Sequence, residues 1–224
     1  MTIGASSTDP RLDGLEDWIA SQLGPVPNFK GARYFAEYLR LLGNELDSVR
    51  RIVELGVAEG ASLLAWSRLC PKAVCLGVDL QWPARLESAL ARLEIEERVE
   101  LVVGDHSEPE GFASTIPEGV DLIVDDGSHF LAPTKRCFLT LFPRLRPGGW
   151  YCIEDWGAGY WESFGGPESG VHRLVYELFD EIAIKDRMKP EAGRFRIPAR
   201  QPMPIEEMRI KGVEPIVFIR RKQR

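Results

Sequence analysis

Between residues 51 and 154, short apolar segments alternate with helical segments, and this alternation constrains the fold more than any other feature of the chain. The apolar segments predict strands at residues 51–57, 73–79, 99–103, 120–125 and 149–154. Helices are expected between them at residues 61–69, 84–93 and 133–142. Because such apolar strands must be buried on both faces, the pattern indicates a doubly wound, mostly parallel α/β sheet.

The N-terminal region differs from this pattern. Apolar residues at helical spacing predict two helices, within 12–23 and 34–42, before the first strand. We expect these helices to lie outside the sheet, as a cap or an oligomer contact. The chain is therefore divided into an N-terminal helical extension at 1–48 and a main domain at 49–224.

The C-terminal region is expected to complete a seven-stranded sheet. A helix is predicted at 172–184, and the Pro-, Arg- and Gly-rich region 186–205 is expected to be a loop. The apolar segment 216–219 predicts an edge strand, paired with a weaker strand near 208–210.

The net charge of −6 does not favour nucleic acid or anionic membranes as partners. No segment approaches an apolar membrane span, and polar residues stand where a signal peptide needs apolar ones. Without a Cys-x-x-Cys pair, the cysteines are expected to be buried free thiols: Cys70, Cys75, Cys137 and Cys152. These features predict a cytoplasmic protein.

The first predicted strand ends in a glycine-rich turn at residues 54–62. Gly56 and Gly60 allow a ligand to approach the backbone, and the next helix directs its N-terminal amides there. A purely structural turn is the alternative. Because position 58 is Ala, the dehydrogenase pattern Gly-x-Gly-x-x-Gly is absent, and no Gly-Lys-Ser/Thr motif for a nucleoside triphosphate follows.

Carboxylates follow the next two predicted strands. Asp79 can bind both hydroxyls of a ribose, and Asp105 lies where an adenine would rest. With the turn, they form a pattern that resembles class I S-adenosylmethionine-dependent methyltransferases over residues 50–155. The expected cofactor contacts are Glu54, Gly56, Ala58, Gly60, Ser62, Asp79, Asp105, His106 and Asp125.

Two acidic clusters end the fourth and fifth predicted strands, at residues 125–129 (Asp-Asp-Gly-Ser-His) and 154–156 (Glu-Asp-Trp). The two strands are expected to be neighbours, so up to four carboxylates share one crevice and repel one another. A cation would relieve this repulsion, and oxygen ligands suit Mg²⁺, with Mn²⁺ or Ca²⁺ possible. Alternatively, the acids face solvent and cap helices. His129, three residues beyond Asp126, is either a general base or an ordinary loop histidine.

The run 125–129, a helix and the run 146–155 (Arg-Pro-Gly-Gly-Trp-Tyr-Cys-Ile-Glu-Asp) are together similar to the metal-dependent sugar O-methyltransferases. The similarity continues into residues 160–166. This resemblance implies Mg²⁺ ligands at Asp126, Glu154 and Asp155, and a catalytic base at His129. It also implies a sugar or glycoside acceptor.

Aromatic residues crowd after the second acidic cluster. They are Trp156, Tyr160, Trp161 and Phe164, which could pack on the faces of a sugar or could form core or oligomer contacts. We predict that a vicinal diol of the acceptor chelates the ion while His129 takes the proton. The alternatives are a catechol-type acceptor, a nicotinamide dehydrogenase, or a module that binds S-adenosylmethionine without catalysis.

Overall fold

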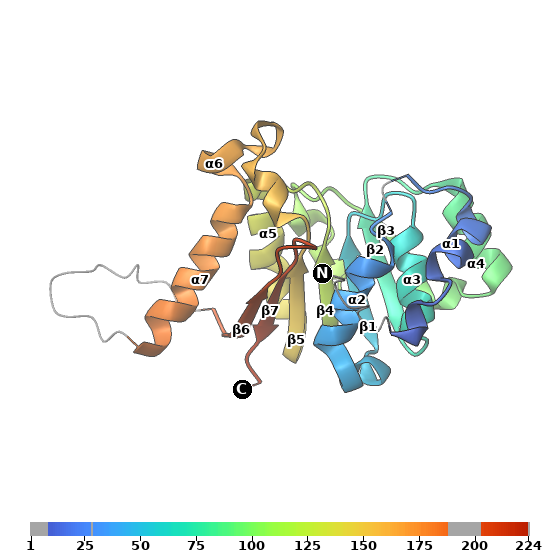
Figure 1. Cartoon of the computed structure of the whole chain (residues 1–224), viewed down its shortest axis with the longest axis horizontal. Coiled ribbons are helices and arrows are strands. Elements are labelled where there is room, and N and C mark those ends of the chain that lie inside the picture. Colours follow the sequence, from blue (N-terminus) through green and yellow to red (C-terminus); the bar gives the residue numbers. More distant parts are fainter. Residues whose placement is uncertain (1–8, 28, 188–202, 224) are drawn as a thin grey trace, which may run out of the picture.

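A computed structural model describes residues 9–27, 29–187 and 203–223. These residues form one seven-stranded sheet in the order β3-β2-β1-β4-β5-β7-β6 (Figure 1). The strands are β1 (Arg51–Leu55), β2 (Val74–Asp79), β3 (Val99–Val103), β4 (Val120–Asp125), β5 (Leu145–Ile153), β6 (Ile205–Ile210) and β7 (Val217–Arg221). β1 to β5 pair in parallel, and β7 is antiparallel to both β5 and β6. The predicted doubly wound, mostly parallel sheet is confirmed.

The C-terminal strands differ from the expectation in their order. β7 lies between β5 and β6, so the segment 216–219 is not an edge strand and β6 is the edge. The reason is burial: Val217, Phe218 and Ile219 are all buried, whereas most of β6 is partly exposed. The expected loop at 186–205 falls largely outside the described residues; its ends belong to a helix that continues to Arg187 and to β6.

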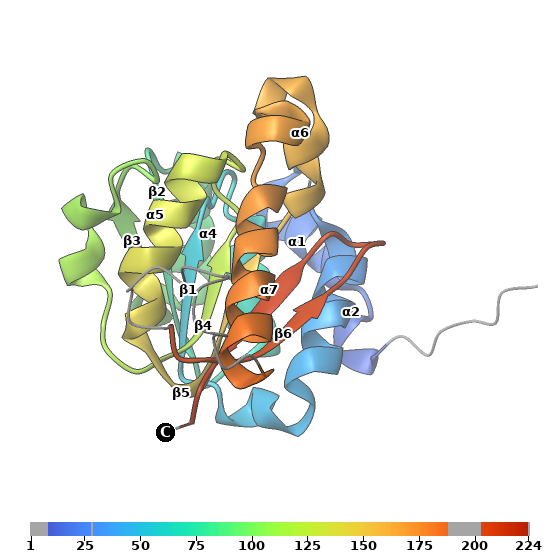
Figure 2. The same cartoon turned by 90° about the vertical axis from the view of Figure 1, so that its left-hand side faces the viewer.

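Helices cover both faces of the sheet (Figures 1 and 2). One face packs against α1 (Leu15–Leu23), α2 (Gly31–Leu42), α3 (Ala61–Leu69) and α4 (Ala84–Leu93). The other packs against α5 (Leu131–Leu141) and α7 (His172–Arg187), and α6 (Gly166–Ser169) is a single turn. Successive residues of β4 alternate between these two cores, as the geometry of a strand requires: Leu122 and Val124 face one, and Ile123 the other.

Short 3-10 helices connect many of these elements. They span Pro10–Leu12, Gly43–Ser48, Glu96–Arg98, Pro109–Gly111, Ala113–Thr115, Phe142–Arg144, Trp156–Tyr160 and Glu162–Phe164. The segment after β5 is therefore built from two such turns, and it carries the aromatic residues that follow the second acidic cluster.

Of the two N-terminal helices, α2 packs on the sheet itself, whereas α1 packs against the helices α2, α3 and α4. The Tyr38 ring of α2 lies 4.9 Å from the Trp66 ring of α3 and 5.3 Å from the Phe218 ring of β7, edge to face in both cases. Phe35 also packs against Trp66, and both residues are fully buried. α2 therefore belongs to the core of the sheet, although the boundary proposed between residues 48 and 49 stays a prediction.

The four cysteines are buried and free, as expected. Within the described ranges, no helix has both the length and the apolar character to cross a membrane. In this sheet order, the chain leaves β1 toward β2 on one side, and β4 lies on the other. In doubly wound sheets, ligands bind at the carboxyl ends of the strands beside this switch point.

Candidate active site

A cavity of about 380 Å³ lies at the switch point, at the carboxyl ends of β1 to β4. Its volume falls in the range of roughly 300–1,000 Å³ of small-molecule sites. Six of the nine residues predicted to contact a cofactor line it: Gly56, Ala58, Ser62, Asp79, Asp105 and His106. Asp126 and Lys30 also line it, so the cavity reaches the first acidic cluster.

The turn after β1 has a conformation that depends on glycine. Gly56 has φ +82°, and a Cβ there would lie 2.2 Å from the carbonyl oxygen of Asp126. Asp79 braces the turn, because its Oδ2 accepts hydrogen bonds from the amides of Val57 at 2.7 Å and Ala58 at 2.8 Å. The turn is therefore held in shape from β2 and packs directly against the loop after β4.

The remaining three predicted cofactor contacts lie behind the cavity wall. Glu54 is fully buried and accepts a hydrogen bond from Ser62 at 2.8 Å. Gly60 is also buried, and a Cβ there would meet the side chain of Leu86. Asp125 is buried within a network of its own. These three residues pack behind the residues that line the cavity and do not line it themselves.

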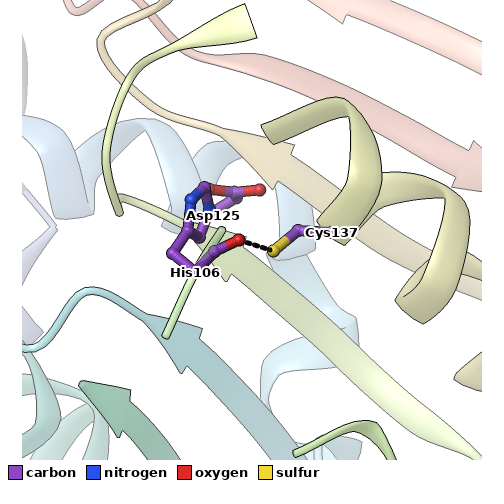
Figure 3. A group of neighbouring side chains, drawn as sticks. All are labelled: His106, Asp125 and Cys137. Carbon is purple, nitrogen blue, oxygen red and sulfur yellow. Dashed lines mark hydrogen bonds and ion pairs between the residues drawn. The ribbon is translucent and has the colours of Figure 1, made fainter. Parts of the chain in front are cut away.

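The network around Asp125 links three strand ends. The Oδ1 atom of Asp125 lies 2.7 Å from His106 Nε2, and its Oδ2 atom accepts a hydrogen bond from Tyr151 at 2.6 Å. His106 Nδ1 lies 3.1 Å from Ser128 Oγ, and Cys137 donates to the His106 carbonyl (Figure 3). Burial alone would lower the pKa of His106, but the Asp125 carboxylate outweighs it and raises that pKa.

A separate group of three possible metal ligands is more exposed than the network around Asp125. Asp126, His129 and Asp155 each place a ligand atom within 4.8 Å of the others, and all three are partly exposed. His129 Nε2 lies 3.8 Å from Asp126 Oδ1. His129 and Asp155 have φ values of +56° and +49°, a region that non-glycine residues rarely adopt. Such backbone conformations cost energy and gather at functional sites, where the surrounding structure enforces them.

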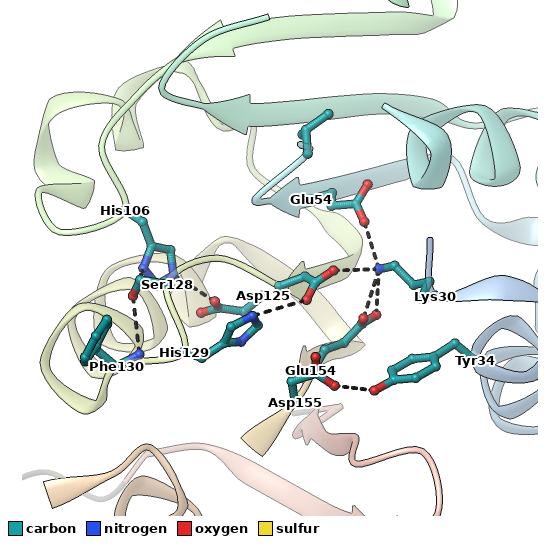
Figure 4. Close-up of polar contacts among 12 residues, drawn as sticks. Lys30, Tyr34, Glu54, His106, Asp125, Ser128, His129, Phe130, Glu154 and Asp155 are labelled. Atoms are coloured by element: carbon teal, nitrogen blue, oxygen red, sulfur yellow. Dashed lines mark hydrogen bonds and ion pairs between the residues drawn. The ribbon is translucent and has the colours of Figure 1, made fainter. Parts of the chain in front are cut away.

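Lys30, immediately before α2, contacts Asp126 of this group, and it was not among the residues predicted from the sequence. Its Nζ atom lies 3.1 Å from Glu54, 3.2 Å from Asp126 and 2.9 Å from Glu154 (Figure 4). Burial would lower the pKa of Lys30, but the three carboxylates outweigh it and raise the pKa well above its usual value. The predicted ion therefore does not have to neutralise these acids alone.

Two tyrosines of α2 reach the second acidic run. Tyr34 donates a hydrogen bond to Asp155, and Tyr38 donates one to Glu154. Burial raises the pKa of Glu154 to about 8, against the opposing effect of Lys30. Of the predicted metal ligands, Glu154 is buried and contacted by both Lys30 and Tyr38. Asp126 and Asp155 are each contacted once from α2 or its N-cap, by Lys30 and Tyr34, and stay partly exposed. The four-residue spacing of Lys30, Tyr34 and Tyr38 was the only sequence signal for this contact.

The predicted acceptor-side aromatics separate into two groups. Trp161 is 66% exposed and packs beside Phe164, whose ring centroid lies 6.0 Å from that of His129. By contrast, Trp156 donates a hydrogen bond to the carbonyl of Lys211, and Tyr160 stacks on His172. Of the aromatic residues singled out in the sequence, Trp161 and Phe164 are therefore the two that lie toward His129.

Comparison with known proteins gives one matching family. Residues 53–156 match the family described as "Methyltransferase domain". The chain is 34% identical over 174 residues to L-olivosyl-oleandolide 3-O-methyltransferase of Streptomyces antibioticus, covering 70% of this chain and 43% of that protein. It is 32% identical over 177 residues to demethylmacrocin O-methyltransferase of Streptomyces fradiae, covering 73% and 40%. The chain thus spans less than half the length of these curated relatives.

Solved structures share the fold. MycE, a methyltransferase from the mycinamycin biosynthetic pathway in complex with Mg and SAH, matches with a TM-score of 0.74 at 24% identity, over 97% of this chain and 56% of that one. The O-methyltransferase TomG from Streptomyces achromogenes, in complex with SAM, matches with a TM-score of 0.59 at 16% identity, over 97% and 92%. MycE and TomG, which share the fold of this chain, thus bind SAH and SAM, respectively.

Proposed function

We propose that this chain, a class I S-adenosylmethionine-dependent methyltransferase that resembles the macrolide sugar O-methyltransferases, methylates a sugar hydroxyl of a glycoside with the help of Mg²⁺. One observation carries the proposal: the cavity under the glycine turn and the open acidic cluster share Asp126. A methyl donor in the cavity and an acceptor at the cluster would therefore meet at the end of β4.

The cavity suits the methyl donor. Gly56 and the first residues of α3, Ala61 and Ser62, line the cavity, and the N-terminus of a helix favours polar or anionic groups of a ligand. Asp79 and Asp105 follow β2 and β3, where a ribose and an adenine would lie. The donor supplies an electrophilic methyl carbon on a sulfonium, and the protein's task is to align a nucleophile with it.

The open cluster suits a divalent ion. Carboxylate oxygens of Asp126 and Asp155 lie near one another on the open side. Glu154, the third predicted ligand, is buried next to Asp155 in the chain, and its carboxylate contacts Lys30 and Tyr38. Oxygen ligands of this kind are those that Mg²⁺ prefers. A bound ion would lower the pKa of an acceptor hydroxyl. The presence of Mg in the MycE complex supports this assignment.

His129 is the proposed general base. It is partly exposed, lies beside Asp126 and borders the aromatic residue Phe164. In this role its ring nitrogen accepts the proton of the acceptor hydroxyl as the oxygen attacks the methyl carbon. Because Mg²⁺ favours oxygen, we assign His129 to the proton rather than to the ion.

The acceptor class follows from the relatives and from the surface beside His129. The names of two curated relatives describe O-methylation of an olivosyl-oleandolide and of a rhamnosyl tetracenomycin, both glycosylated compounds. In this chain, Phe130, Phe164 and Trp161 make a neighbouring set of aromatic rings. Flat rings of this kind can pack against the C–H faces of a sugar, and the preference for a sugar over a catechol rests on the names of the relatives.

Calorimetry tests the proposal first. S-adenosylmethionine is titrated into the protein with Mg²⁺ and then with a chelator, and we expect binding in both conditions. Turnover is then measured with a panel of glycosides and catechols, and activity with glycosides that is lost on chelation is the expected result. Absence of cofactor binding would refute the proposal, and turnover of catechols alone would change the acceptor. Binding without turnover across the panel would favour a non-catalytic module.

A further inference from the structure

Lys30, at the N-cap of α2, and two tyrosines of α2 lie on one side of the helix. Lys30, Tyr34 and Tyr38 are four residues apart, a spacing that stacks side chains on one face of a helix. All three contact the acidic residues that end β1, β4 and β5. We call this set the α2 polar face.

The members of the α2 polar face together contact four carboxylates, and two of them share Glu154. An ammonium group has three N–H donors, and Lys30 has one carboxylate within 3.2 Å for each: Glu54, Asp126 and Glu154. Tyr38 adds a second donor to Glu154, and Tyr34 donates to Asp155. Figure 4 shows Lys30 and Tyr34 approaching this edge from the side opposite His129.

We propose that the α2 polar face positions Glu154 and Asp155, and through Lys30 also Asp126, for the divalent ion of the proposed methyl transfer. The inference rests on the proposed function, because positioning of these carboxylates as metal ligands matters only if the site binds an ion. It makes the N-terminal helix a part of the active site and not only a part of the core.

The physical argument is that a ligand carboxylate needs a fixed orientation. Asp155 has positive φ and sits at the start of a loop, so the strand register of β5 alone does not fix its side chain. The hydroxyl of Tyr34 is the hydrogen-bond donor that holds one of its oxygens. Residues that hydrogen-bond to metal ligands set ligand orientation, and their removal typically costs about 10–100-fold in metal affinity or activity.

Tyr34→Phe is the sharpest variant, because it removes one hydroxyl from a partly exposed ring and leaves the buried ring of Tyr38 in place. Tyr176→Phe is the matched control. Tyr176 lies on α7, and its hydroxyl is also hydrogen-bonded, in this case to Tyr160. Mn²⁺ serves as the probe ion and its dissociation constant is measured by electron paramagnetic resonance, while SAH binding is measured by calorimetry.

We expect Tyr34→Phe to weaken Mn²⁺ binding about tenfold, with SAH affinity within about twofold of the wild type. Tyr176→Phe should change neither. Tyr38→Phe should have a smaller effect on Mn²⁺ than Tyr34→Phe, because Lys30 still holds Glu154.

The outcomes separate this inference from the proposed function. If wild-type protein binds Mn²⁺ and Tyr34→Phe binds it equally well, the α2 polar face only anchors the helix, and the inference fails while the proposed function stands. If wild-type protein binds SAH but no Mn²⁺, the ion is refuted and the inference with it. A lower melting temperature of Tyr34→Phe with unchanged Mn²⁺ affinity would likewise contradict the positioning role.

Discussion

Two clusters of potential metal ligands each take one of two consecutive residues at the end of β4, Asp125 in one and Asp126 in the other. The first, His106, Asp125 and Cys137, is held together by internal hydrogen bonds and is mostly buried. The second contains Asp126, His129 and Asp155, and all its members are partly exposed. Residue types alone would allow a metal in either cluster, so composition does not separate them.

The difference comes from the end of β4. Asp125 is the last residue of the strand and lies among buried groups, where both of its oxygens find donors in His106 and Tyr151. Asp126 is the first residue beyond the strand, and its side chain faces the cavity. A buried carboxylate must be fully hydrogen-bonded, whereas an open one keeps lone pairs for a ligand. One residue of register therefore separates Asp125, whose two oxygens are both hydrogen-bonded, from Asp126, the proposed metal ligand.

The strongest test of this comparison exchanges the two acids for amides. Asp126→Asn should abolish detectable Mn²⁺ binding and lower kcat by on the order of 10³-fold or more, because several kcal/mol of charge stabilisation depend on the ion. Asp125→Asn should lower stability but keep Mn²⁺ affinity within a fewfold. Equal losses of Mn²⁺ binding in both variants would erase the distinction between the clusters.

The two histidines should differ in the same way. His129→Ala should lower kcat by about 10²–10⁴-fold, the usual contribution of a general base, with SAH affinity nearly unchanged. His106→Gln should change kcat by less than about tenfold, because we assign His106 no proton transfer. Steady-state kinetics at saturating cofactor make the comparison. His129→Ala activity within a fewfold of the wild type would remove His129 from the role of base.

The lysine that enters the open cluster should matter for stability. Lys30→Met leaves Glu54 and Glu154 buried without a cation and should cost about 3–5 kcal/mol, as for other broken buried ion pairs. Lys135→Met breaks an exposed pair with Glu177 and should cost less than about 1 kcal/mol. Urea denaturation in the presence of a chelator gives both values. A small loss for Lys30→Met would mean that the two buried acids are protonated in the folded protein.

The smallest expected effect concerns the pH dependence of the buried cluster. Because the pKa of His106 is raised in the folded state, protonated His106 stabilises the fold. This contribution is fully present below about pH 6.5, the usual pKa of histidine, and is lost as pH rises through the folded pKa. The free energy of unfolding of His106→Gln should therefore fall less than that of the wild type above this pH. Parallel pH profiles from urea denaturation would contradict the shift.

Much of this architecture was predictable because its signals are local. Apolar runs separated by helical periodicity fixed the parallel part of the sheet, and neighbouring strands four and five brought the two acidic runs together as expected. The order of the last two strands was predicted wrongly. The uninterrupted apolar run 216–219 is typical of a strand buried on both faces, whereas β6 carries three charged residues, so the sequence held this signal and the edge was assigned to the wrong strand.

The candidate site was likewise predictable from the sequence only in part. The sequence by itself determined which residues end each strand, and with them the glycine turn, Asp126, His129 and Asp155. The tertiary structure decided that Asp125 turns inward and that Lys30 and Tyr34 approach from a helix 90 or more residues earlier in the chain. The physical reason is that strand ends gather by the regular repeat of the sheet, whereas a helix packed on the sheet meets them through side-chain contacts that no local pattern records.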